Sequence, residues 1–191
     1  LGDVYKRQTI GWQHNCYDGY LHVKPVVFWQ QENLLQQYLP NLDRYIVLSD
    51  YDKRDYMEKL GIDCEVKINP RSFVSEKKCD VKSKRFLMAT RFVYAKGLDL
   101  MMESFEEFCK EDSEWELDII GDGDLFDQIR ADAKKRHLEK RVHFVGYTNE
   151  PEKYYLNSSV FLLPSRWEGW PMVIMEAFEF GLPVIAYHMG A

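Results

Sequence analysis

The sequence lacks the long apolar runs and the excess of positive charge that identify many membrane proteins and nucleic-acid-binding proteins. No apolar run approaches the about 18 residues that a membrane-spanning helix needs. Positive charge is also scarce, since the formal net charge is −6 at pH 7. A chain with this balance has no electrostatic footprint for nucleic acid, so we expect no nucleic-acid partner. With 46% hydrophobic residues in 191, the chain can nevertheless bury a sizeable core.

Motifs for metals and for common catalytic centres are missing as well. The sequence contains no H-E-x-x-H, nucleophile elbow, Walker loop or calcium loop, and we expect neither a metal nor a cofactor. The four cysteines form no C-x-x-C pair and are expected to be reduced thiols. The expected compartment is the cytoplasm, and a peripheral contact with the inner face of a membrane stays open. The cysteines are Cys16, Cys64, Cys79 and Cys109.

Both ends of the sequence look foreign to a natural protein. The chain begins without Met, and residues 1–8 (LGDVYKRQ) resemble a translated adapter, so we leave them out of the fold prediction. Ala191 follows shortly after a predicted strand, with no closing helix. We therefore expect a partial reading frame.

The first third of the chain alternates short apolar runs with amphipathic stretches. Residues 9–75 are expected to be the C-terminal part of one α/β domain, and a polar stretch, Ser72–Lys84, is expected to be a linker or exposed loop. The predicted strands are Thr9–His14, Arg44–Leu48 and Cys64–Ile68. The predicted helices are Val26–Leu39, with Val27 on its apolar face, and a second that Ser49 or Asp50 caps and Gly61 ends.

Residues 84–191 alternate more regularly and are expected to form a second domain. Short apolar strands between helices are typical of a parallel sheet that is covered on both faces, and such a domain binds ligands at the carboxyl ends of its strands. We expect at least four parallel strands. The predicted strands are Arg85–Ala89, Glu116–Ile120, Val142–Val145, Val160–Leu163 and Pro183–Ala186. The predicted helices are Leu98–Lys110, Leu125–Leu138, Pro151–Asn157 and Pro171–Phe180.

Two carboxylates stand at a strand–loop–helix junction in this second domain. Glu168 lies in the loop, and Glu176 lies about two turns into the helix that follows Pro171. The first N–H groups of that helix, near Met172 and Val173, lack intrahelical partners and suit a phosphate. A carboxylate before the helix can bind sugar hydroxyls, and one on the helix can bind a ribose diol. Taken singly, Glu168 as a helix cap and Glu176 as a solvated charge would be the simpler interpretation.

Two cations follow the first strand of the same domain. Arg91 and Lys96 share one loop, as suits a diphosphate that gains negative charge when its bond to a sugar breaks. Gly121 and Gly123 end the next strand, but residue 126 is Phe, so the G-x-G-x-x-G pattern of dinucleotide sites is not met.

These segments resemble family-4 retaining glycosyltransferases, which have the GT-B fold. Residues 166–186 (RWEGWPMVIMEAFEFGLPVIA) are similar to the family's E-x₇-E signature, with Glu168 and Glu176 on its acidic positions. Residues 89–97 (ATRFVYAKG) resemble its G-R…K-G element, although Thr90 stands where Gly is usual. The resemblance covers nearly all of residues 85–191 and reaches more weakly back to Thr9.

The resemblance implies two Rossmann-like doubly wound domains, both incomplete here, that act on a UDP- or GDP-linked sugar. The acceptor would be a saccharide or lipid-linked saccharide, as in polysaccharide biosynthesis, and no metal is implied. Glu168 and His14 would face the donor sugar as catalytic residues. The implied donor-binding residues are Arg91, Lys96, Gly121, Gly146, Gly169, Trp170, Met172, Val173 and Glu176.

Other interpretations remain open from the sequence. A structural role has at least equal weight for His14, Gly121 and Gly146. A sugar-nucleotide epimerase or a phosphorylase can use the same scaffold, because fold does not fix chemistry. A fragment that binds a nucleotide sugar without turning it over is the alternative outside enzymes.

Overall fold

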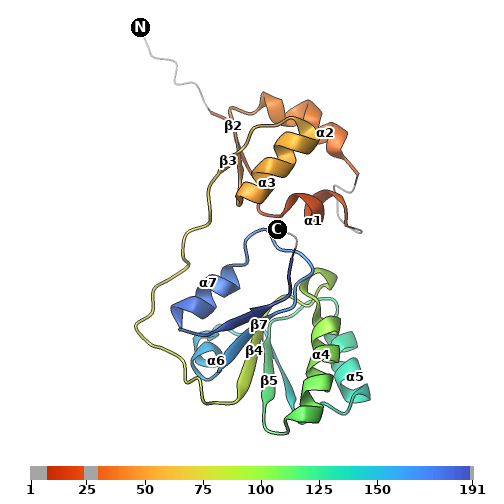
Figure 1. The fold of residues 1–191 in the computed structure, drawn as a ribbon, viewed down its shortest axis with the longest axis vertical. Helices are drawn as coiled ribbons and strands as arrows, with labels where there is room; N and C mark the ends of the chain where they lie inside the picture. Colours follow the sequence, from red (N-terminus) through yellow and green to blue (C-terminus); the bar gives the residue numbers. More distant parts are fainter. Residues whose placement is uncertain (1–7, 24–29, 190–191) are drawn as a thin grey trace. The chain divides into compact units, whose positions relative to one another are not determined.

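Two separate parallel sheets organise the chain in the computed structural model, which describes residues 8–23 and 30–189 (Figure 1). One compact unit comprises the described residues up to Pro70 together with residues 167–170, and the other comprises residues 71–166 and 171–189. Most of the predicted adapter (residues 1–7) lies outside the described residues. So does the start of the predicted Val26–Leu39 helix, including Val27.

The N-terminal unit contains a three-stranded parallel sheet in the order β1-β2-β3. All three predicted strands are confirmed, each a little shorter than expected. The strands are β1 (Ile10–Trp12), β2 (Arg44–Val47) and β3 (Glu65–Val66). The helices are α1 (Tyr17–Leu21), α2 (Glu32–Tyr38) and α3 (Asp50–Asp55), with a 3₁₀ turn η1 (Leu39–Asn41) and a π-helical turn η2 (Tyr56–Leu60). Helix α1 was not predicted, because five residues are too few to show a period.

The caps of the third helix follow the sequence prediction. The Ser49 hydroxyl accepts a hydrogen bond from the Asp52 amide at 3.0 Å, which satisfies one of the amides left without a partner at a helix start. The helical segment ends at Gly61, whose φ of 71° is left-handed. Both predicted ends are therefore confirmed.

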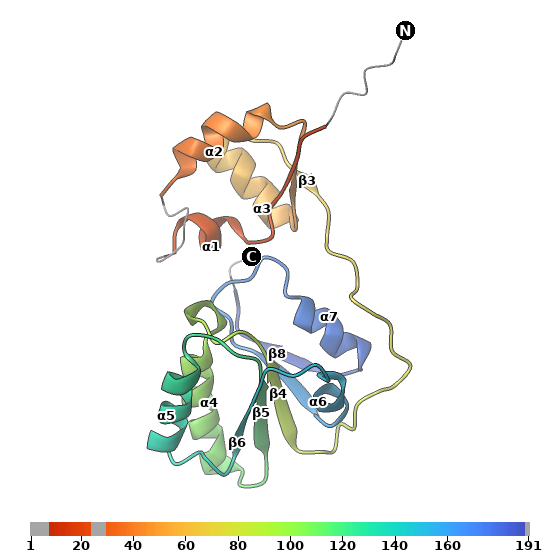
Figure 2. The same ribbon diagram turned by 180° about the vertical axis from the view of Figure 1, so that it is seen from behind.

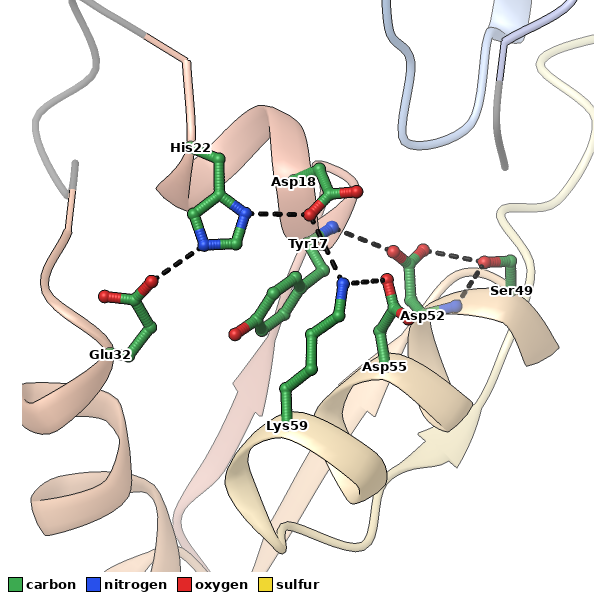
Figure 3. A network of polar contacts seen from close by, with 8 residues as sticks. All are labelled: Tyr17, Asp18, His22, Glu32, Ser49, Asp52, Asp55 and Lys59. Carbon is green, nitrogen blue, oxygen red and sulfur yellow. Dashed lines mark hydrogen bonds and ion pairs between the residues drawn. The ribbon is translucent and has the colours of Figure 1, made fainter.

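Side-chain hydrogen bonds join the three helices of this unit (Figure 3). The buried Asp52 accepts bonds from the Tyr17 amide at 2.9 Å and from the Ser49 hydroxyl at 2.7 Å. Lys59 bonds Asp55 at 3.0 Å, and its ammonium lies 4.5 Å from the centre of the Tyr17 ring. We call the eight residues of Figure 3 the polar network; they are Tyr17, Asp18, His22, Glu32, Ser49, Asp52, Asp55 and Lys59.

The C-terminal unit contains a five-stranded, all-parallel sheet in the order β6-β5-β4-β7-β8, which confirms the prediction of at least four parallel strands. The strands are β4 (Arg85–Ala89), β5 (Glu116–Ile120), β6 (Val142–Gly146), β7 (Val160–Leu163) and β8 (Val184–Ala186). The helices are α4 (Leu98–Glu111), α5 (Phe126–Lys135), α6 (Glu152–Leu156) and α7 (Met172–Glu179), with a 3₁₀ turn η3 (Tyr94–Lys96).

Helices cover both faces of this sheet, as Figures 1 and 2 show. Along β4, Phe86 and Met88 belong to a core with residues of α4 and α5, whereas Leu87 belongs to a second core with residues of α6 and α7. The alternation follows from the period of two in a strand. Both faces are apolar, as the continuous hydrophobic runs in the sequence predicted.

The polar stretch between the units is largely exposed, as predicted, but it also bonds to the C-terminal unit. The C-terminal unit begins at Arg71, upstream of the boundary that was predicted between residues 75 and 84. The Ser75 amide donates to the Glu179 carboxylate at 3.0 Å, and the Lys78 ammonium donates to the Glu179 carbonyl at 2.6 Å. Carbonyls at a helix C-terminus lack intrahelical partners, and this segment supplies donors to them at the end of α7.

Among the described residues, none of the helices combines the length and the apolar character needed to cross a membrane.

Candidate functional site

Most of the predicted donor residues lie along one edge of the C-terminal sheet. Because the strands are parallel, their carboxyl ends meet at the same edge. Arg91 and Lys96 follow β4, Gly121 follows β5, and Gly146 ends β6. Helix α7, which starts at Met172 and carries Glu176, follows β7. Residues remote in sequence therefore come together at the edge where this class of sheet binds ligands.

Backbone hydrogen bonds lock the loops of this edge to one another. The Thr90 amide donates to the Ile120 carbonyl, and the Phe92 amide donates to the Asp122 carbonyl, each at 2.9 Å. The Gly121 amide donates to the Gly146 carbonyl, also at 2.9 Å. The ends of β4, β5 and β6 thus form one hydrogen-bonded surface and not three independent loops.

Gly121 and Gly146 owe their residue type to different causes. At Gly121 the φ is 124°, and a Cβ atom would lie 1.8 Å from the Thr90 carbonyl oxygen, so only glycine fits. At Gly146 the φ is 79°, but a Cβ atom would meet nothing within 4 Å. The close approach of the loops and the backbone conformation both require glycine at position 121, whereas the backbone conformation alone accounts for Gly146. Open space beside Gly146 is also what a ligand would need.

The two predicted cations lie in different settings. Arg91 is exposed, and its guanidinium makes no ion pair within the part of the chain that the structure describes. Lys96 is half-buried and is the last residue of the η3 turn. The next residue, Gly97, has a φ of 64° and packs against the Pro164 carbonyl. An exposed cation with no carboxylate partner suits an anionic ligand.

The start of α7 offers backbone donors. Pro171 precedes the helix without a side-chain cap, and the first turn contains no acidic residue. The amides of Met172 and Val173 are therefore available where the helix dipole favours negative charge. Further along, the Glu176 carboxylate is half-buried and accepts a hydrogen bond from the Tyr155 hydroxyl at 2.8 Å.

Arg166 joins the loops after β4 and β7, a role that the sequence analysis missed. Its guanidinium donates to both Asp99 carboxylate oxygens at 2.8 and 2.5 Å and to the Tyr94 carbonyl at 2.8 Å. Its amide bonds the Ala95 carbonyl at 2.8 Å. The hydrogen bonds from Arg166 lower the pKa of Asp99, so the pair is ionised at neutral pH. Asp99 lies 67 residues away in the chain, and no local pattern could reveal the pairing.

The remaining candidates belong to the N-terminal unit. His14 follows β1, is exposed, and stacks on the Trp12 ring with the ring centres 5.4 Å apart. Residues 167–170, which include Glu168 and Gly169, are grouped with this unit and not with the loops of the second sheet. The indole Nε1 of Trp170 is buried and has no hydrogen-bond partner among the described residues.

Metal ligands do not gather in the described part of the chain. Within residues 8–23 and 30–189, no group of three or more His, Cys, Asp or Glu side chains is placed to hold an ion.

A doubly wound unit with an exposed arginine, Arg91, on a strand-end loop and an uncapped helix start at α7 is typical of domains that bind phosphorylated ligands. The comparisons with known proteins specify the family. Residues 72–191 match the model described as "Glycosyl transferases group 1", and the chain belongs to that family.

Two curated relatives illustrate the similarity. An uncharacterized glycosyltransferase of Haemophilus influenzae is 30% identical over 148 residues, which are 76% of this chain and 42% of that protein. The lipopolysaccharide 1,6-galactosyltransferase of Salmonella typhimurium is 31% identical over 105 residues, which are 53% of this chain and 29% of that protein. The chain thus spans less than half the length of either relative.

A solved structure shows the same fold. The crystal structure of S. aureus TarM in complex with Fondaparinux, alpha-GlcNAc-glycerol and UDP has a TM-score of 0.85 and covers 96% of this chain and 37% of TarM. At 22% identity this likeness concerns the fold. It confirms the predicted α/β fold of GT-B type.

Proposed function

We propose that this chain carries the donor-binding part of a glycosyltransferase. The enzyme moves a sugar from a UDP- or GDP-linked donor to a saccharide or lipid-linked acceptor, with retention at the anomeric carbon, in polysaccharide biosynthesis. Family membership supports the reaction class. Support for the donor class comes from the S. aureus TarM and pneumococcal GtfA crystal structures, which are both complexes with UDP.

The strongest support within this chain is the carboxyl edge of the C-terminal sheet. Arg91 presents an exposed charge with no ion pair among the described residues. Helix α7 follows β7, the strand beside β4, and begins with uncapped amides. When the bond between the sugar and the diphosphate breaks, negative charge grows on the diphosphate. Cations and helix amides that are already in place stabilise that charge without reorganising. We assign this role to Arg91 and Lys96, with no metal ion.

The two carboxylates have different roles in this proposal. Glu176 binds the ribose diol, which changes little during the reaction. Glu168 binds hydroxyls of the donor sugar, where charge and geometry change, and His14 faces the same sugar. Only interactions that strengthen in the transition state raise kcat, so the two carboxylates should affect different kinetic constants.

The compartment that we propose is the cytoplasm, with a contact at the inner face of the membrane for a lipid-linked acceptor. The four cysteines form no disulfide, and two of them, Cys16 and Cys64, are buried. Burial raises the pKa of the Cys16 thiol to about 11 and that of the Cys64 thiol to about 12, so both stay protonated and unreactive at neutral pH.

Steady-state turnover of radiolabelled nucleotide sugars tests the proposal. We expect Glu176→Gln mainly to raise the donor KM by roughly 10- to 150-fold, as the loss of a charged hydrogen-bond acceptor does. Glu168→Gln and Lys96→Ala should instead lower kcat. If Glu168→Gln keeps the wild-type kcat while Glu176→Gln abolishes turnover, the assigned roles are wrong.

The same assay separates the alternatives. Transfer to an acceptor or release of the free sugar supports a glycosyltransferase, whereas conversion of one nucleotide sugar into another indicates an epimerase. Phosphate-dependent release of a sugar phosphate indicates a phosphorylase. Binding without any turnover leaves a nucleotide-sugar-binding protein.

A further inference from the structure

Tyr155 is held rigidly in the core of the C-terminal unit. The residue lies on α6 and is only 1% exposed. Its ring stacks nearly parallel on Phe161, with centres 5.7 Å apart and planes at 7°, and on Phe180, with centres 5.2 Å apart and planes at 22°. A ring packed between two others on a sheet and a helix has a fixed position, and so does its hydroxyl.

The hydroxyl of this fixed ring reaches the predicted ribose ligand. It donates to Oε2 of Glu176 at 2.8 Å. Burial, followed by the charge of Glu176, raises the pKa of Tyr155, so the phenol keeps its proton and remains a donor at neutral pH. A glutamate has three rotatable bonds, and a bond to one of its oxygens removes much of that freedom before any ligand arrives.

A cavity opens beside the pair. Its volume is about 730 Å³, within the range of small-molecule sites, and both Tyr155 and Glu176 line it, together with Asn149 and Pro151 from the loop after β6. Figure 2 shows α6 and α7 on the same side of the sheet. Residues of both helices line the cavity, and so do Phe73, Val74, Ser75 and Lys77. Glu176 therefore bonds to Tyr155 in the core and also lines a space large enough for a nucleoside.

We propose that Tyr155 is a positioning residue that holds Glu176 so that its second oxygen, Oε1, meets the ribose hydroxyls of the donor. Tyr155 thereby contributes to selection of a ribonucleotide over a deoxyribonucleotide. This inference rests on the proposed role of Glu176 and adds to it a residue that does not touch the ligand.

Nucleotide binding to the 191-residue chain tests the inference. UDP, GDP and ADP are titrated by calorimetry, and the tightest binder is then compared with its own 2′,3′-dideoxy form. In the wild type we expect the ribonucleotide to bind more tightly. Tyr155→Phe keeps the stacked ring and removes one oxygen atom, and it should weaken the ribonucleotide by roughly 5- to 10-fold, in line with one lost hydrogen bond. The dideoxy form should bind as before.

Two further variants guard against a merely structural effect. Tyr154→Phe removes a hydroxyl from the neighbouring residue, whose ring contacts Lys153, and should leave both affinities unchanged. In a Glu176→Ala background, Tyr155→Phe should have no additional effect, because there is no carboxylate left to hold. An equal loss for both nucleotides, or a further loss in the Glu176→Ala background, would overturn the positioning role.

Failure of the inference differs from failure of the proposed function. If none of the three nucleotides binds, the nucleotide-sugar proposal fails and the role of Tyr155 fails with it. If the wild type binds both forms equally, Glu176 does not hold the ribose. If the wild type discriminates and Tyr155→Phe discriminates equally well, only the inference about Tyr155 is wrong.

Discussion

The N-terminal unit combines an apolar core with a buried carboxylate, Asp52, that bonds the start of α1 from α3, whereas the C-terminal unit has apolar cores on both faces of its sheet. The N-terminal strands have only two to four residues, and the apolar core of that unit includes Tyr17, Tyr45 and Tyr56. The polar network adds directional bonds to that core. The C-terminal sheet has five strands and covers both faces with helices.

The difference shows how each unit positions its loops. The C-terminal unit fixes its strand-end loops with backbone hydrogen bonds, such as that from Gly121 to Gly146. The N-terminal unit fixes the start of α1 with a side chain, since the Tyr17 amide bonds Asp52. We therefore expect a substitution in the strand-end loops of the C-terminal unit to lower stability mainly through backbone conformation. A substitution at the start of α1 in the N-terminal unit should lower stability mainly through lost polar partners.

The largest effect is expected at Gly121. In Gly121→Ala the new Cβ meets the Thr90 carbonyl, at a φ of 124° that alanine disfavours. We expect the free energy of unfolding of the C-terminal unit to fall by on the order of 3 kcal/mol. Gly146→Ala is the matched control, with a positive φ but open space, and should lose only about 1 kcal/mol. Amide hydrogen exchange in β4 and β5 measures both; equal losses would mean that the close approach of the loops is unimportant.

A somewhat smaller effect is expected at Asp52. In Asp52→Ala the buried Tyr17 amide and the Ser49 hydroxyl lose their acceptor, so the N-terminal unit should lose about 2 kcal/mol. Asp118→Ala is the counterpart in the other unit. Arg85 would keep Glu116, at 2.5 Å, after losing Asp118, so the loss should be smaller. Hydrogen exchange that ranks Asp118→Ala above Asp52→Ala would contradict the contrast between the units.

Arg166 and Arg91 are expected to have different roles: Arg166 positions loops, whereas Arg91 is available to a ligand. Arg166→Met should lower the stability of the C-terminal unit by about 1 kcal/mol, because its ion pair with Asp99 is partly exposed. Arg91→Met should leave stability unchanged and weaken binding of UDP or GDP. Thermal unfolding and calorimetry on the two variants give the comparison. A destabilised Arg91→Met would show that this side chain has a structural role.

The C-terminal fold was predictable because its signals are local. Continuous apolar strands and intervening amphipathic helices specify a parallel sheet, and the strand Arg85–Ala89 has the same bounds in the structure as in the prediction. The N-terminal unit was less accessible, since α1 depends on the bond from the Tyr17 amide to Asp52, 35 residues away. A local sequence pattern is too short to include both Tyr17 and Asp52.

Some residues of the candidate site were likewise predictable from the sequence, and others were not. Residue type and position at strand ends were enough to bring Arg91, Gly121 and Glu176 to one edge of the sheet. Arg166 and Tyr155 were missed because each acts on a partner brought near by the tertiary fold. For Tyr155 the sequence shows only an aromatic residue on a short helix, which is typical of an ordinary core position. The roles assigned to the site residues remain predictions until the kinetic variants are measured.

The smallest expected effect concerns the response of the polar network to pH. His22 lies between two carboxylates, with Nδ1 at 2.8 Å from Asp18 and Nε2 at 2.7 Å from Glu32 (Figure 3). Burial alone would lower the pKa of His22, but the hydrogen bonds and charges of the two acids outweigh it and raise the pKa above the usual value. Lys59 also faces this cluster through Asp18, and its own pKa is raised, so it stays charged from pH 6 to 9.

The sign of the pH dependence follows from the raised pKa. The folded unit binds the His22 proton more tightly than the unfolded chain does, so the stabilisation is fully present below the unfolded pKa of about 6.5 and is lost as the pH rises through the folded value. Because the ring is 40% exposed, solvent screens the pair and the gain should be only a few tenths of a kcal/mol. Hydrogen exchange in α1 and α2, corrected for intrinsic rates, should show the N-terminal unit more stable at pH 6 than at pH 8.5. His22→Gln should remove that difference; a variant that keeps it would assign the pH response to another group.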